Sequence, residues 1–101
     1  MALMKFDGVI EAVRYKNGHN VWVRAYERRG ATFSDRVLLN RKDLAERLDK
    51  GKKFMTGRRR EFLASTFELG KAVQTVQHAG QDVIATRADA ARDELEGLPV
   101  F

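Results

Sequence analysis

The sequence predicts a mainly β fold in which three strands precede a single helix and further strands follow it. The segment Val21–Arg28 alternates apolar and polar side chains with the period of two that a strand has. Asn17-Gly18 is a strong hairpin signal, because both residues tolerate a positive φ. Segment 40–51 instead has an N-cap residue, helical apolar spacing and a glycine at its end.

Size and composition favour one soluble domain with a single modest core. The chain has 101 residues, of which 44% are hydrophobic and 33% charged. No apolar run approaches the roughly 18 residues that span a bilayer, and segment 1–7 lacks a signal-peptide pattern. With no cysteine there is neither a disulfide framework nor a thiolate metal site. We therefore expect a cytoplasmic protein without a membrane partner and without a metal or other cofactor.

Three strands form the first half of the expected fold. Phe6–Tyr15 alternates loosely and predicts the first strand, and Lys16–Asn20 turns the chain. Val21–Arg28 is the second strand. A tight turn at 29–31 leads into a third strand at Thr32–Leu39, so that the three strands form a meander.

A helix is expected directly after the third strand. Asn40 is a good N-cap, and Asp43 complements the positive end of the first turn. Leu44 and Leu48 lie four residues apart and therefore share one face, which needs an apolar surface to cover. Gly51 is the natural C-terminal stop.

The second half is expected to add shorter strands and a final helix. Lys52–Thr56 predicts a fourth strand that ends in a turn at Gly57 and the arginines after it. The remaining expectations are strand at 66–67 and 72–76 with a bend at Gly70, a turn at 78–80, a short strand at 82–85, and a helix that begins with the capping-box-like Thr86-Arg87-Ala88-Asp89 and ends at Gly97.

This order of elements, from Gly8 to Val76, resembles the oligonucleotide-binding (OB) fold. The most similar part is 44–57, where a helix that ends in glycine leads into a short strand that also ends in glycine. The resemblance implies an OB-like β-barrel of order βββαββ, with its helix between strands three and four. Residues 1–86 would form the barrel, and 87–101 a C-terminal helix with an acidic tail. An SH3-like barrel or another α+β roll fits the same order.

Charge is distributed unevenly along the chain. Residues 1–60 hold 16 Lys and Arg against 7 Asp and Glu, a net +9, whereas residues 61–101 hold 3 against 7, a net −4. A basic body joined to an acidic end is typical of proteins with a nucleic-acid partner.

Two features form the expected nucleic-acid site. One face of the second strand presents Trp22, Arg24, Tyr26 and Arg28, on which bases could stack and phosphates be neutralised, with Phe33 as a further aromatic. Segment 50–60 has six basic residues and no acidic one, and from it we select Lys52, Lys53, Arg58, Arg59 and Arg60 as phosphate ligands. The alternative is that the arginine stems cover half-buried aromatic rings and that the basic segment is a solvated loop.

The C-terminus resembles the tail of bacterial single-stranded DNA-binding proteins. Acidic Asp93, Glu94 and Glu96 are followed by Leu98, Pro99 and Phe101, although Val100 separates the proline from the phenylalanine and no long linker precedes the motif. The resemblance implies docking of a protein partner through Leu98, Pro99 and Phe101. The alternative is that this apolar tip folds back onto the barrel.

Catalysis finds no support in the sequence. His19 and His78 lack metal-ligand spacing, and neither Ser34 nor Ser65 lies in a nucleophile elbow. We therefore expect a non-enzymatic protein that binds single-stranded nucleic acid, with DNA as the first candidate, and with little sequence preference. The alternative function is a small protein-interaction or dimerisation module, with a phage or mobile element as its candidate origin and without a nucleic-acid role.

Overall fold

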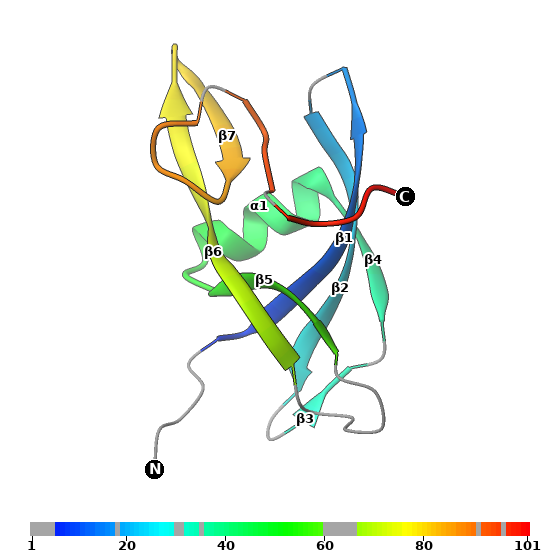
Figure 1. The fold of residues 1–101 in the computed structure, drawn as a ribbon. Helices are drawn as coiled ribbons and strands as arrows, with labels where there is room; N and C mark the ends of the chain where they lie inside the picture. Colours follow the sequence, from blue (N-terminus) through cyan, green and yellow to red (C-terminus); the bar gives the residue numbers. More distant parts are fainter. Residues whose placement is uncertain are drawn as a thin grey trace.

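The computed structural model describes residues 6–17, 19–29, 32–34, 36–59, 67–90, 92–95 and 97–101. It confirms a mainly β fold with one helix (Figure 1). The elements are β1 (Gly8–Lys16), β2 (His19–Arg29), β3 (Thr32–Phe33), β4 (Val37–Asn40), α1 (Arg41–Asp49), β5 (Phe54–Arg59), β6 (Phe67–His78) and β7 (Gln81–Ala85). The sheet has the order β3-β2-β1-β5-β6-β7, and β4 also pairs with β2. All these pairs are antiparallel except β1 with β5.

The sheet is not closed into the expected barrel. Within the described residues, β7 at one end pairs with neither β3 nor β4 at the other. Strand β1 lies inside the sheet and pairs with β5 only over Gly8–Ile10. Further along β1, Val13 pairs instead with the C-terminal segment: its N–H donates to the Pro99 carbonyl, and its carbonyl accepts from the Phe101 N–H, both at 3.0 Å. In Figure 1 this red segment runs from the β7 side across to β1.

The expected third strand is divided into β3 and β4, so the order βββαββ is also wrong. Phe33 pairs with Arg28 and Val37 with Ala25, which leaves one extra residue on the β3–β4 side. Ser34 stabilises this interruption, because its hydroxyl accepts from the Glu27 N–H at 3.1 Å and its own N–H donates to the Glu27 carbonyl at 2.8 Å.

The helix begins and ends where the sequence predicts. The side chain of Asn40 accepts a hydrogen bond from the Asp43 N–H at 2.8 Å, as an N-cap does. Gly51, just beyond the helix, has a φ of 84°, a conformation that favours glycine. Leu44 is fully buried, whereas Leu48 packs at the border of the core.

The basic segment does not form the expected single loop. Strand β5 continues through Gly57 to Arg59, so the turn expected at these residues is wrong. A register shift between Met55 and Gly57 accommodates an extra residue on β6 near Gly70, which confirms the bend expected there. A Cβ at Gly57 would collide with the Glu68 carbonyl oxygen, so glycine permits this close pairing. Because strand side chains alternate, Arg58 is exposed whereas Arg59 points inward.

No helix is formed by the described residues after Thr86, so the expected C-terminal helix is wrong there. The chain instead lies along the edge of β7, where the Thr86 N–H donates to the Glu94 carbonyl at 3.0 Å and the Glu94 N–H to the Ile84 carbonyl at 3.1 Å. This pairing satisfies edge groups of β7 that a helix would leave open. It also places Leu95 in the core.

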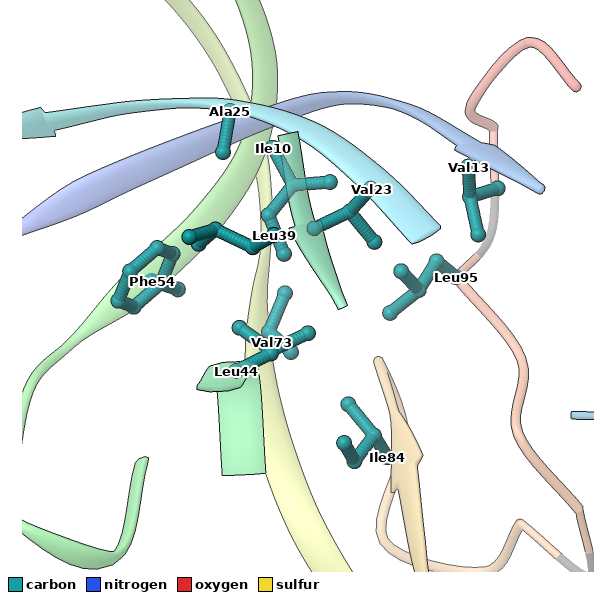
Figure 2. Packing of buried hydrophobic residues seen from close by; sticks show 10 residues of the cluster. All are labelled: Ile10, Val13, Val23, Ala25, Leu39, Leu44, Phe54, Val73, Ile84 and Leu95. Carbon is teal, nitrogen blue, oxygen red and sulfur yellow. The ribbon is translucent and has the colours of Figure 1, made fainter. Parts of the chain in front are cut away.

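The main core lies between the sheet and α1. Figure 2 shows ten side chains that point toward one another from seven elements and the C-terminal segment: Ile10, Val13, Val23, Ala25, Leu39, Leu44, Phe54, Val73, Ile84 and Leu95. A second cluster contains Phe6, Val9, Tyr26 and Phe67. Both faces of β2 therefore carry buried side chains. No helix in the described part of the chain is long and apolar enough to cross a membrane.

Candidate nucleic-acid interface

The face of β2 that was expected to stack bases is only partly open. Trp22 is 41% exposed, and Arg24 and Arg28 are half-buried. Tyr26, between the two arginines, is only 3% exposed. The structure thus keeps one of the two aromatic rings of this face accessible to a ligand.

Tyr26 belongs to the second cluster rather than to an open site. Its ring lies 5.3 Å from that of Phe67, and the guanidinium of Arg59 lies 4.2 Å from its centroid. Its hydroxyl donates to Glu11 Oε2 at 3.1 Å, and its contact with Arg36 raises the pKa of that arginine, chiefly through the hydrogen bond. Stacking of a base on Tyr26 is incompatible with this burial, which corrects the prediction from the strand pattern.

Phe33 is engaged in the same cluster. Its ring stacks on Phe6 with centroids 5.4 Å apart and meets the ring of Phe67 at 4.8 Å. Arg28 covers it, with its guanidinium carbon 4.9 Å from the centroid. Two aromatic contacts and one cation–π contact hold Phe33 in place, so it offers little to a base.

Trp22 has cationic neighbours on the open part of the face. It pairs across strands with Arg14 of β1, and Arg24 follows two residues along β2 on the same face. Both guanidiniums lie over the ring of Phe101, at 4.2 Å for Arg24 and 4.9 Å for Arg14. An exposed indole flanked by guanidiniums is an arrangement that can stack a base and neutralise its phosphates.

A groove of about 1010 Å³ begins beside Arg24. Its walls are the C-terminal residues 97–101 on one side and β5 and β6 on the other, with Ala12 between them. Among the residues that the structure describes, the charged side chains that line it are Arg24, Arg58, Lys71, Glu11 and Glu68, three cations against two carboxylates. Its apolar lining includes Leu69, which is itself exposed.

The remaining basic residues predicted as phosphate ligands are dispersed. Arg58 pairs with Glu68 at 2.9 Å, and Arg59 lies over Tyr26. Lys52 and Lys53 are exposed in the loop between α1 and β5. Arg60 lies outside the described residues.

Lys52 lines a second hollow, of about 450 Å³, which also brings in Arg28 from β2. Its other basic residues are Arg29 and Arg47. Neither of them was among the predicted site residues.

Arg14, which lies beside Trp22, was also absent from the predicted site. The hairpin turn alone would place Arg14 opposite Val21, and only the register shift between Arg14 and Tyr15 moves it opposite Trp22. No local sequence signal indicates that shift.

The apolar tip of the C-terminus packs against the sheet. Leu98 contacts the main core, Pro99 and Phe101 hydrogen-bond to Val13, and the Phe101 carbonyl accepts from Arg14 Nε at 2.8 Å. This arrangement corresponds to the alternative in which the apolar tip folds back onto the body of the protein rather than docking a partner.

Among the described residues no group of three or more His, Asp or Glu side chains could hold a metal ion.

No protein-family model matches the chain, and no curated protein or solved structure is significantly similar to it.

Proposed function

We propose that this protein binds single-stranded nucleic acid on the face that carries Trp22. The observation that supports it best is the exposure of Trp22 between two arginines, Arg14 and Arg24. A stacked base gains contact with an aromatic face regardless of its identity, so such a site has little sequence preference. Single strands are favoured because a duplex offers no unpaired base to the indole.

The groove beside Arg24 extends this surface. A strand that leaves Trp22 passes Arg24 and reaches the groove rim at Arg58 and Lys71. Arg58 and Glu68 are both well exposed, with side chains 72% and 48% accessible. Exposed ion pairs contribute about 0–1 kcal/mol, so a phosphate can replace the carboxylate at little cost. The sequence of the C-terminus, which resembles the acidic tail of bacterial single-stranded DNA-binding proteins, makes DNA the first candidate.

A second candidate function is a protein-interaction or dimerisation module. Leu38 is 57% exposed and lies diagonally beside Trp22, because Leu38 pairs with Arg24 while Trp22 pairs with Asn40. Two exposed apolar side chains on one face suit a protein partner, including a second copy of this chain.

The two functions are separated by a titration of labelled single- and double-stranded oligonucleotides of one sequence. We expect tighter binding of single strands, and Trp22→Ala to weaken it by about 1–3 kcal/mol, the usual contribution of one stacked base. Tyr26→Phe is the matched control: it changes an aromatic residue of the same strand face that is buried, so the affinity should stay the same. Equal affinity for duplexes, or an unchanged affinity of Trp22→Ala, would contradict the proposal. A dimer in sedimentation that Leu38→Ala dissociates, without nucleic-acid binding, would favour the second candidate.

The salt dependence of binding tests the arginines separately from the indole. On single strands each phosphate contact contributes about 0.7 to the slope of log affinity against log salt concentration. We expect Arg14→Gln with Arg24→Gln to reduce the slope by roughly 1.4, because two contacts are lost. Trp22→Ala should lower the affinity and leave the slope unchanged. A double variant with the parental slope would show that these arginines do not meet phosphates.

A further inference from the structure

The aromatic ring of Phe101 lies under the two arginines that flank Trp22. The guanidinium carbon of Arg24 is 4.2 Å from the ring centroid, and that of Arg14 is 4.9 Å from it. Both distances are within the roughly 6 Å at which a cation is attracted to an aromatic face. The two arginines come from neighbouring strands, Arg24 from β2 and Arg14 from β1. A single ring from the C-terminal segment therefore contacts both of them.

This ring stands where other arginines of the protein have an acidic partner. Arg41 and Arg47 each form an ion pair with an acidic side chain. Within the described part of the chain, neither Arg14 nor Arg24 forms such a pair with an Asp or Glu side chain. Phe101 thus holds the two guanidinium groups through a ring, which leaves their positive charge for an external anion.

The ring is held in place by the backbone of its own segment. The Phe101 N–H donates to the Val13 carbonyl at 3.0 Å, and the Phe101 carbonyl accepts from Arg14 Nε at 2.8 Å. The Pro99 carbonyl accepts from the Val13 N–H at 3.0 Å, and Leu98 packs against the main core. In Figure 1 the red segment that contains these residues lies beside β1. The position of the ring is therefore fixed without a ligand.

Arginines held in this way remain able to bind phosphate. A contact with an aromatic ring does not use the N–H donors of a guanidinium group, which has five of them in one plane. Free arginine side chains adopt many rotamers, and a ligand that orders them loses part of its binding free energy. Arg14 and Arg24 are ordered by Phe101 in advance, so that a phosphate does not have to order them.

We infer that Phe101 is a positioning residue of the nucleic-acid site, an inference that rests on the proposed function. Its ring holds the guanidinium groups of Arg14 and Arg24 beside Trp22, where they meet the phosphates next to a stacked base. Arg14 lies opposite Trp22 on β1, and Arg24 lies two residues along β2 on the same face. The C-terminal segment is then part of the interface rather than a docking tail for another protein.

The test is a double-mutant cycle on the affinity for a labelled single strand of about ten nucleotides at low salt. Phe101→Leu removes the aromatic face and keeps an apolar side chain and the backbone hydrogen bonds. We expect it to weaken binding about tenfold, because the ligand must then order two arginine side chains. In a protein that already carries Arg14→Gln and Arg24→Gln, Phe101→Leu should change the affinity by less than about twofold, since no guanidinium is left to position.

Two variants complete the experiment. Phe101→Tyr keeps the aromatic face and should bind within about twofold of the parent protein. Phe33→Leu is the matched control, because it removes a ring under a different arginine: the Arg28 guanidinium lies 4.9 Å from the Phe33 centroid. Since Arg28 does not flank Trp22, this variant should retain the parental affinity.

The outcomes distinguish this inference from the proposed function. Unchanged affinity of Phe101→Leu, or an equal loss with and without the two arginines, would overturn the positioning role. In both cases a loss of affinity in Trp22→Ala would leave the proposed function intact. If Phe101→Leu weakens binding only where the arginines are present, and Trp22→Ala has no effect, the positioning role is supported and the stacking proposal fails. If the parent protein binds no single strand, both are wrong.

Discussion

Replacing Asp93 with alanine is expected to destabilise the protein by about 3 kcal/mol, in the range for breaking a buried ion pair. The Asp93 side chain has no exposed surface. It accepts hydrogen bonds from Arg41 Nε at 2.8 Å, Arg41 Nη2 at 3.1 Å and the Ile84 N–H at 2.9 Å. The hydrogen bond with Asp93 raises the pKa of Arg41 above its ordinary value. Alanine would remove the acceptor for all three bonds. Because Arg41 is 31% exposed and can still meet water, we place the loss at the lower end of that range.

Thermal unfolding followed by circular dichroism measures this effect. For a domain of this size, about 3 kcal/mol corresponds to a decrease in Tm of at least about 10 °C. Asp89→Ala is the matched control, because Asp89 is 85% exposed and lies 3.6 Å from the Arg87 guanidinium. Its loss should cost less than about 0.5 kcal/mol. Similar melting temperatures for the two variants would show that Asp93 does not hold the C-terminal segment to α1 and β7.

Replacing Leu44 with alanine is expected to cost about 2–5 kcal/mol of unfolding free energy, as for other fully buried leucines. Leu44 has no exposed surface and is the buried residue through which α1 enters the main core (Figure 2). Removal of its isobutyl group leaves a cavity between α1 and the sheet. Leu48→Ala should cost less, since Leu48 lies only partly within the core.

Urea unfolding gives the free energies for this comparison. Leu38→Ala is the matched control, since Leu38 lies on the solvent side of β4 and should change stability by less than about 0.5 kcal/mol. A Leu44→Ala variant as stable as Leu38→Ala would mean that α1 does not cover the sheet.

Much of the fold could be predicted because its signals act within a few residues. The helix begins directly after Asn40 because the side-chain amide of this residue, three residues before Asp43, can cap the first turn, whatever the rest of the chain does. The turn before β7 has a positive φ at Ala79 and Gly80, as the position of the glycine indicated. The alternation of β2 likewise predicted that Val23 and Ala25 enter the core.

The candidate site could be predicted less well because its members depend on distant partners. Trp22 and Tyr26 occupy equivalent positions on one strand face, yet only Trp22 is exposed. Tyr26 is covered by Phe67 and Arg59, which the pairing of β5 with β6 brings over it. The strand pattern contains no information about that second layer.

Local sequence signals were sufficient for the mainly β class, the helix and its ends, the turn before β7, and the basic and aromatic composition of β2. These properties follow from backbone preferences and side-chain periodicity, whose energies are local. The tertiary structure alone decided that the sheet stays open, that the basic segment is divided between the loop 50–53 and β5, and that the C-terminal segment pairs with β7 and β1 rather than forming a helix. Those choices depend on competition among long-range pairings. Pairing along the β7 edge and the buried Asp93–Arg41 contact stabilise the observed path of the chain more than the capping pattern at Thr86 stabilises a helix.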